Sequence, residues 1–180
     1  MATLTPDERR RILGFVRGIV SAACAGGRDP EAPELPLLAE KGACFVTLRE
    51  NGGVRGCIGS VEAFEPLAEN LRRNAENAAF SDPAFPPLDA DELAFTTIEV
   101  ALPAVPRRLA APEEADLERD GLLLVAGNRR AVFLPGTVAE QRWTLHEAWE
   151  HLAIKAGLPP DSWRDPATEL YAFECETFAE

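Results

Sequence analysis

Arg55 and Cys57, two residues apart, are the side chains whose types and spacing most directly suggest chemistry. They follow a strand pattern at 43–49 and an Asn-Gly-Gly turn pattern at 51–53, and this combination predicts a β-hairpin. Because side chains alternate along a strand, both would point to one face of the sheet. A fixed cation near a thiol favours the thiolate, the reactive form of cysteine. The pair predicts a catalytic thiol, and the alternative of a small apolar residue packed in a sheet stays open beside it.

Gly56 and Gly59 flank this cysteine on the same predicted strand. Glycine inside a strand costs stability unless a bulge or a close approach requires it. The two glycines either leave room beside the thiol for a substrate or reflect close packing, and the sequence leaves both interpretations open.

A helix is predicted over residues 66–79, and three asparagines, Asn70, Asn74 and Asn77, form a stripe along it. Asparagine is a poor helix residue because its side chain competes for backbone hydrogen bonds. Such a stripe would line a polar cleft, in which case Asn74 and Asn77 would contact a substrate. The more frequent explanation for such a row is an exposed polar helix boundary.

Two acidic residues are further candidates for binding a substrate. Asp82 lies in a proline-broken, aromatic loop at 80–88 that we expect to pack back on the protein, where it is either a turn-forming residue or a site carboxylate. Glu99 lies in the middle of a predicted strand at 94–102, on the face opposite Ile98. An acid on the wet face of an antiparallel sheet is ordinary, and Glu99 gains interest only if Cys57 shares that face.

The remaining cysteines and the two histidines predict no metal site and no cofactor. Cys44 alternates with Val46 on a strand face and is interpreted as core, and the sequence has no Cys-x-x-Cys pair. His146 and His151 are five residues apart on one predicted helix, so they diverge by roughly 140° and cannot share an ion. Glycine-rich phosphate-binding loops are also absent.

Composition limits the class of protein. A chain of 180 residues supports one well-buried core, so we expect a single domain over residues 1–180. Its net charge of −12 repels phosphate backbones and makes nucleic acid an unlikely partner. No apolar run approaches the roughly 20 residues that span a bilayer, and the N-terminal residues do not resemble a secretory signal. We therefore expect a cytoplasmic protein with no membrane segment.

The other elements predict the fold class. Capping boxes at 5–8 and 144–147 begin two helices, and a second hairpin is predicted over 122–134. Residues 170–178 alternate and are predicted to form one outer strand. Because the strands come as hairpins rather than parallel crossovers, the sequence predicts an α+β fold with a mixed, mainly antiparallel sheet packed against helices.

Residues 55–60, Arg-Gly-Cys-Ile-Gly-Ser after a Thr-Leu-Arg strand, resemble the signature of the AMMECR domain family, also called AmmeMemoRadiSam system protein A. The resemblance covers nearly the whole chain and continues at 78–88, 98–100, 133–135 and 155–158. It implies a domain with a smaller lobe and a cleft between the lobes. It places Arg55, Gly56, Cys57 and Gly59 at the heart of the site. The family name further implies Memo-type and radical-SAM proteins as partners.

This sequence departs from the family pattern at two places. Family members commonly have arginine where this chain has Ala84, and Leu-Pro-Gln-Val where it has Gly136 and Thr137 after Leu-Pro. A ligand pocket that uses either segment would therefore differ here. The leading hypothesis is an enzyme or enzyme component with a reactive Cys57 that acts on a small molecule or a protein-bound group. The alternative is a non-catalytic adaptor that docks a partner protein through its sheet or cleft.

Overall fold

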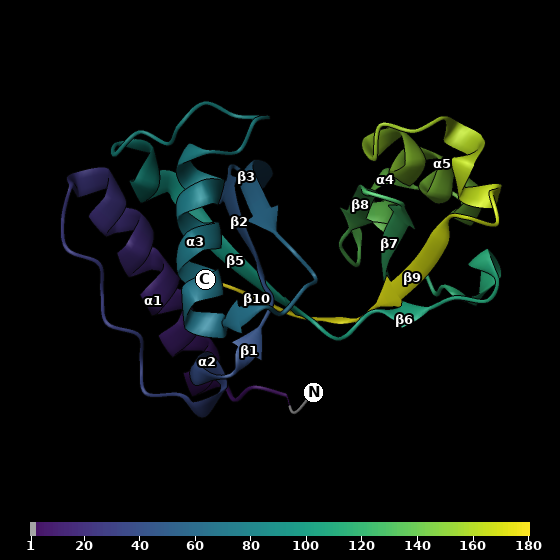
Figure 1. Cartoon of the computed structure of the whole chain (residues 1–180). Coiled ribbons are helices and arrows are strands. Elements are labelled where there is room, and N and C mark those ends of the chain that lie inside the picture. Colours follow the sequence, from purple (N-terminus) through teal and green to yellow (C-terminus); the bar gives the residue numbers. More distant parts are fainter. Residues whose placement is uncertain (1–2) are drawn as a thin grey trace. The chain divides into compact units, whose positions relative to one another are not determined.

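The chain passes twice between two units in the computed structural model, which describes residues 3–180. The first unit extends to Pro103 and resumes at Glu176–Glu180, and the second comprises Ala104–Cys175 (Figure 1). The second unit is therefore an insertion between two strands of the first.

The sheet of the first unit has the strand order β10-β5-β2-β3. Its strands are β2 (Phe45–Glu50), β3 (Gly53–Gly59), β5 (Thr96–Pro103) and β10 (Cys175–Ala179). The predicted hairpin is confirmed as β2–β3. Its turn residues Asn51 and Gly52 have φ values of 50° and 80°, the left-handed conformation that a tight hairpin turn requires and that asparagine and glycine tolerate. β3 is an edge strand of this sheet.

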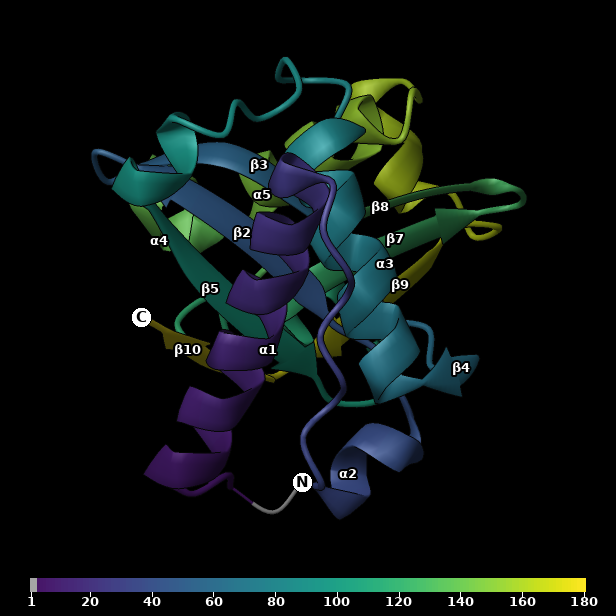
Figure 2. The same ribbon diagram turned by 90° about the vertical axis from the view of Figure 1, so that its left-hand side faces the viewer.

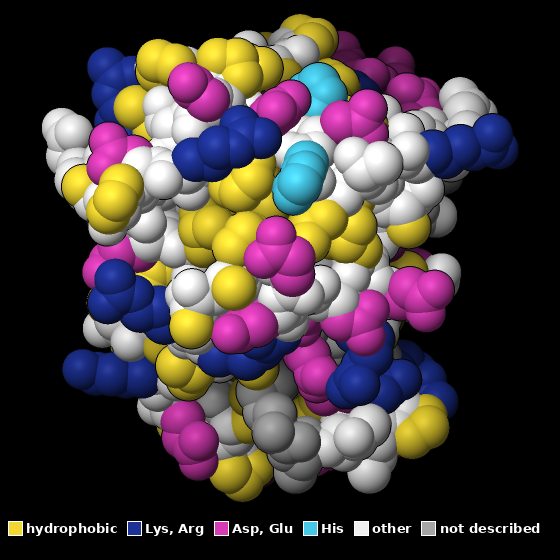
Figure 3. Space-filling model, turned by 90° about the vertical axis from the view of Figure 1, so that its right-hand side faces the viewer, with side chains coloured by type: hydrophobic (Ala, Val, Ile, Leu, Met, Phe, Trp, Pro, Cys, Tyr) yellow, Lys and Arg dark blue, Asp and Glu magenta, His cyan; other side chains and the backbone are white. Residues whose placement is uncertain are grey.

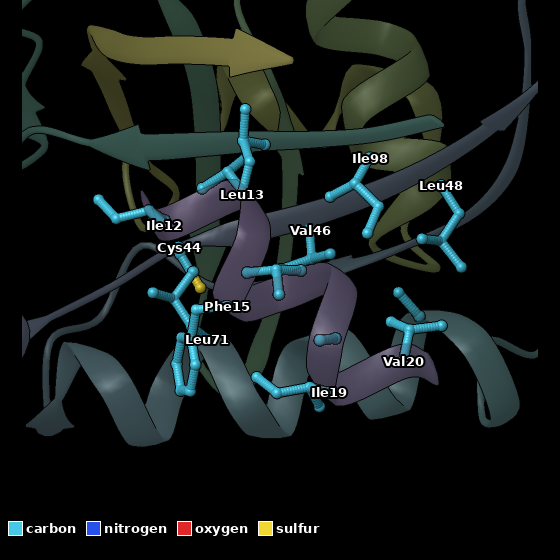
Figure 4. Close-up of a cluster of buried hydrophobic side chains, with 14 of the residues drawn as sticks. Ile12, Leu13, Phe15, Ile19, Val20, Cys44, Val46, Leu48, Leu71 and Ile98 are labelled. Carbon is cyan, nitrogen blue, oxygen red and sulfur yellow. The ribbon is translucent and has the colours of Figure 1, made fainter. Parts of the chain in front are cut away.

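Helices α1 (Pro6–Ala25) and α3 (Leu67–Phe80) cover one face of this sheet (Figures 1 and 2). Apolar side chains recur at helical spacing along α1 and pack on alternate residues of β2 and β5 (Figure 4). The core includes Ile12, Val16, Ile19, Cys44, Val46, Leu48, Leu71 and Ile98. The interpretation of Cys44 as a core residue is confirmed. The remaining elements of this unit are α2 (Pro36–Ala39), β1 (Lys41–Gly42), β4 (Glu65–Pro66) and η1 (Glu92–Phe95).

The second unit has its own four-stranded sheet, in the order β6-β9-β7-β8. Its strands are β6 (Arg107–Arg108), β7 (Gly121–Ala126), β8 (Arg129–Phe133) and β9 (Glu169–Phe173). Its helices are η2 (Pro112–Glu114), α4 (Thr137–Gln141), α5 (Leu145–Lys155) and η3 (Pro160–Arg164). Trp149 and Leu152 of α5 are fully buried in a separate core with Leu122 and Leu124 of β7. The paired strands of the two units are antiparallel and are combined with helices, which confirms the α+β prediction.

Two predicted strands differ from the structure. The single strand predicted at 170–178 is two strands: β9 lies in the second unit's sheet and β10 in the first's, with Glu174 between them. Alternation continues through both segments, so the pattern alone carries no sign of a change of sheet. The strand predicted from Ala94 begins at Thr96, because residues 92–95 form η1. Among residues 3–180, no helix combines the length and apolarity needed to cross a bilayer.

Both predicted capping boxes are present, at the starts of α1 and α5. The Thr5 hydroxyl accepts a hydrogen bond from the Glu8 N–H, and the Glu8 carboxylate accepts one from the Thr5 N–H. These bonds to Thr5, from its side chain first and then its backbone, lower the pKa of Glu8.

We expect Thr5→Ala to lower the free energy of unfolding by about 1 kcal/mol, because the substitution leaves an N-terminal N–H of α1 without its acceptor. Urea titration followed by circular dichroism measures this loss. Thr5→Ser is the matched control, since it keeps the accepting oxygen and should remain close to the wild type. Equal losses in both variants would contradict the capping role.

Candidate functional site

The predicted pair Arg55 and Cys57 lies on β3, and Arg55 is part of a β-bulge in that strand. Leu48 of β2 pairs with Gly56, and the next residue, Arg49, pairs with Val54, so Arg55 is an extra residue without a partner on β2. A bulge interrupts the alternation of side chains along a strand. The prediction of unbroken alternation through this segment is therefore wrong at Arg55, and the two side chains have different surroundings.

The guanidinium of Arg55 binds the segment that follows α3. Its Nε and Nη2 donate to the two carboxylate oxygens of Glu92 at 3.0 and 2.9 Å. Nη1 donates to the carbonyl of Pro86 at 2.9 Å, and Nη2 also reaches that of Pro87. Arg55 is only 9% exposed. The hydrogen bonds from Arg55 lower the pKa of Glu92, the carboxylate with which Arg55 pairs.

Cys57 lies in a polar row that crosses three neighbouring strands. Thr47 of β2 pairs with Cys57 of β3 on one side and with Glu99 of β5 on the other, so the three side chains share one face of the sheet. The Thr47 hydroxyl donates to the Cys57 sulfur at 3.2 Å, and Thr47 is 3% exposed. The condition that made Glu99 interesting, a face shared with Cys57, is met.

Arg49 is the cation on this face that the sequence analysis missed. It lies two residues from Thr47 along β2, and its Nε and Nη2 donate to the two oxygens of Glu99 at 3.1 and 3.2 Å. The only signal for it is the alternation of Thr47 and Arg49 along the strand. That signal points to Cys57 only once the pairing of β2 with β3 is known. The polar row and Arg49 together bring a thiol, a hydroxyl, a guanidinium and a carboxylate to one side of the sheet.

Asp82 is brought to Cys57, but to its main chain. One carboxylate oxygen accepts the Cys57 N–H at 2.8 Å, and the other accepts the Ala84 N–H at 2.9 Å. The second bond is the turn-forming interaction that the local sequence predicts. The first bond joins the loop to the edge of β3.

The asparagine stripe is largely inside the first unit. Asn74 is 4% exposed, and its amide group donates to the carbonyl of Cys44 at 3.1 Å and to the side-chain oxygen of Asn70 at 2.9 Å. Asn70 in turn accepts the Cys44 N–H at 3.0 Å. An exposed helix boundary is therefore wrong for these two asparagines, which bind α3 to Cys44, the residue just before β2. Asn77, one turn later, is half-buried.

Gly56 and Gly59 both lie where another backbone approaches closely. A Cβ on Gly56 would clash with the carbonyl oxygen of Ala78 in α3, and a Cβ on Gly59 would lie 2.5 Å from the Cα of Phe45. Of the two interpretations left open by the sequence, close packing accounts for both glycines.

The other three cysteines carry raised thiol pKa values. Burial raises the pKa of Cys44 to about 12, and burial also raises that of Cys175 to about 12. Burial, with a smaller effect from Asp89, raises the pKa of Cys24. Thiols with a pKa of about 12 are almost entirely protonated at neutral pH, so Cys44 and Cys175 are poor nucleophiles.

The two histidines, cyan on the face shown in Figure 3, contact different tryptophans. The ring of His151 stacks on Trp143 at 4.0 Å, and that of His146 lies 5.3 Å from Trp163. Within residues 3–180, no group of three or more His, Cys, Asp or Glu side chains is placed to hold a metal ion.

These features define an α+β protein with a glycine-flanked cysteine on the edge strand of an antiparallel sheet. The AMMECR1 family model matches residues 13–178, and the chain belongs to this family. It is 34% identical to a protein of Methanothermobacter thermautotrophicus, over 99% of this chain and 97% of that protein. It is 36% identical to a protein of Methanopyrus kandleri, over 98% and 90%. The crystal structure of an uncharacterised protein from Pyrococcus horikoshii is similar, with a TM-score of 0.93, 30% identity and coverage of 98% of this chain and 93% of that one.

Proposed function

We propose that this AMMECR1-family protein is an enzyme, or a component of one, in which the Cys57 thiol is the reactive group. The observation that carries the proposal is the row formed by Cys57, Thr47 and Glu99, with Arg49 bound to Glu99 on the same face. A hydroxyl donor at the sulfur favours a thiolate, and Arg49 adds a positive charge to the same face of the sheet. The substrate would be a small molecule or a group carried on a protein.

Each side chain has a distinct role in this proposal. Cys57 supplies the nucleophilic sulfur, and the Thr47 hydroxyl holds it by a hydrogen bond. Arg49 supplies the positive charge, and Glu99 orients Arg49 through its two hydrogen bonds. In this proposal Arg49, which like Arg55 is paired with a carboxylate, takes the activating role because it shares the face of the sheet that carries Cys57.

We also propose a cellular compartment and partner proteins for this reaction. The four cysteines are thiols rather than disulfides, which supports a reducing, cytoplasmic compartment. The association with Memo-type and radical-SAM proteins rests on the name given to family members, and it supports a place in a multi-component modification pathway.

A second candidate, a non-catalytic adaptor, is favoured by a different observation. Arg55, Gly56 and Gly59 each have a packing or ion-pair role that requires no substrate. The motif would then be a structural hairpin, and the protein would act by docking a partner. Cys57→Ser separates the candidates, because it should abolish a reaction that needs a thiolate and leave docking nearly unchanged.

The test of the reactive thiol is alkylation of the native protein at pH 7.5, with each cysteine followed by mass spectrometry. We expect Cys57 to react first with both iodoacetamide, which is neutral, and iodoacetate, which is anionic. Arg49→Ala should lower the ratio of the iodoacetate rate to the iodoacetamide rate about fivefold, because a cation is lost from the face of the sheet that carries the sulfur. Glu99→Gln should raise this ratio.

Arg10→Ala is the matched control for the charge effect. Arg10 is an exposed arginine that pairs with Asp7 on α1, so its removal changes the net charge equally without touching the polar row. Its ratio should equal that of the wild type. If Cys57 stays unmodified until the protein unfolds, the thiol is structural and the adaptor becomes the leading function.

A further inference from the structure

We propose that residues 81–92, called the strap below, fix the main chain at Cys57, and that Asp82 and Arg55 are its positioning residues. The inference rests on the proposed function, because it states how the reactive thiol is held in place. Neither residue is assigned contact with the substrate.

The strap is attached to β3 at two residues, called anchors below. The first anchor is Asp82, whose carboxylate accepts a hydrogen bond that a neighbouring strand would otherwise accept. In the part of the chain that the structure describes, β3 pairs only with β2, so the Cys57 N–H, which points away from β2 to Asp82, has no neighbouring strand to accept it. The Asp82 carboxylate accepts it at 2.8 Å, and its other oxygen closes a turn within the strap at Ala84. One side chain therefore shapes the strap and bonds it to the residue that carries the thiol.

The second anchor is Arg55, which is placed by the bulge in β3. Its guanidinium bonds to the carbonyls of Pro86 and Pro87 and to both oxygens of Glu92, all within the strap. Glu92 also accepts the Asp89 N–H at 2.7 Å, so the carboxylate that binds Arg55 also closes the strap's own last turn. A buried arginine with four such bonds is a rigid attachment.

The two anchors enclose Gly56, which lies so close to α3 that an added Cβ would clash with the carbonyl oxygen of Ala78. The strap is joined to α3 as well, because the N–H of Leu88 donates to the carbonyl of Ala79 at 2.7 Å and Leu88 is buried. The backbone from Arg55 to Cys57 is therefore held by β2, by α3 and by the strap. This geometry fixes the strand from which the Cys57 side chain extends toward Thr47.

The experiment compares Asp82→Ala with Asp89→Ala in the full chain. Asp89 lies in the same strap, and its carboxylate closes a turn at Asp91 without bonding to β3, so it is a matched control. We expect Asp82→Ala to speed hydrogen exchange at the Cys57 amide about tenfold, measured by NMR, and Asp89→Ala to change it less than twofold. Alkylation of Cys57 by iodoacetamide should change at least threefold in Asp82→Ala only.

Asp82→Asn tests rescue, because an amide oxygen keeps one acceptor. Asp82→Asn should restore most of the protection of the Cys57 amide and bring the alkylation rate within twofold of the wild type. If Asp82→Ala fails to fold, Arg55→Lys is the second variant. It keeps the charge but loses the paired bonds to Glu92, so it should speed exchange at the same amide. Unchanged exchange in these variants would overturn the strap, and lost protection with an unchanged alkylation rate would overturn the positioning role. An inert wild-type thiol together with lost protection would instead overturn the proposed function while supporting the strap.

Discussion

Gly56→Ala is expected to lose at least about 3 kcal/mol of the free energy of unfolding, a large share of the roughly 5–15 kcal/mol that stabilises a typical domain. The added methyl group would overlap the carbonyl oxygen of Ala78 and would lie 3.1 Å from its carbonyl carbon. These atoms belong to the backbone of α3, so no side-chain rotation relieves the overlap. Either α3 or the edge strand must move, and both are packed in the core of the first unit. Urea titration followed by circular dichroism measures the loss.

Gly53→Ala is the control for this prediction. Gly53 begins the same strand, and its φ lies outside the left-handed region. A Cβ there would be 3.5 Å from its nearest neighbour, the carbonyl oxygen of Glu50, which is ordinary contact. We expect its stability to stay within about 0.5 kcal/mol of the wild type. If Gly56→Ala matched Gly53→Ala, the close approach of α3 to β3 would be contradicted.

Local chemistry explains what could be predicted from the sequence. The left-handed turn at Asn51 and Gly52 and the capping boxes at Thr5 and Thr144 depend on residues within four positions of one another. Such short-range rules identified the first hairpin and the starts of two helices before any tertiary contact was known.

The candidate site depended on contacts that are distant in the sequence. The bulge at Arg55 arises where β3 must meet β2, the strap and α3 at once, and nothing in residues 53–59 alone reveals it. Arg49 and Glu99 are fifty positions apart and meet only through the pairing of β2 with β5. The sequence therefore placed Cys57 beside Arg55, its neighbour along the chain, and could not show that Thr47, Glu99 and Arg49 share the face of Cys57.

The asparagine stripe shows the same limit in a helix. Asn74 has the spacing of an exposed or cleft-lining residue, yet β2 lies against that side of α3, and the backbone of Cys44 supplies the partners for its amide. A polar side chain can be buried when its hydrogen bonds are satisfied, and only the tertiary structure shows whether they are.

Between pH 9 and 12, we expect the free energy of unfolding of the wild type to fall more steeply with rising pH than that of Cys44→Ser. Burial raises the pKa of the Cys44 thiol from its ordinary value of 9.0 to about 12 in the folded protein. In this window the unfolded chain has lost that proton and the folded protein keeps it, so the folded state binds more protons and stability falls as pH rises. Below pH 9 the Cys44 thiol is protonated in both states, so its full contribution to the free energy of unfolding is present.

The expected difference in slope is up to about 1.4 kcal/mol per pH unit, the limit for one proton. Serine does not ionise in this range, and its hydroxyl can replace the bond that the thiol makes to the side-chain oxygen of Asn70 at 3.2 Å. Urea titrations of both proteins at about pH 8, 9, 10 and 11 give the two slopes.

Cys24→Ser is the control, because the Cys24 thiol that it removes is partly exposed and burial raises the pKa of that thiol less. Parallel slopes for the wild type and Cys44→Ser would contradict the burial of Cys44 as a neutral thiol. A steeper fall in the wild type and in Cys24→Ser than in Cys44→Ser would establish that the core encloses a thiol that cannot ionise unless the protein opens.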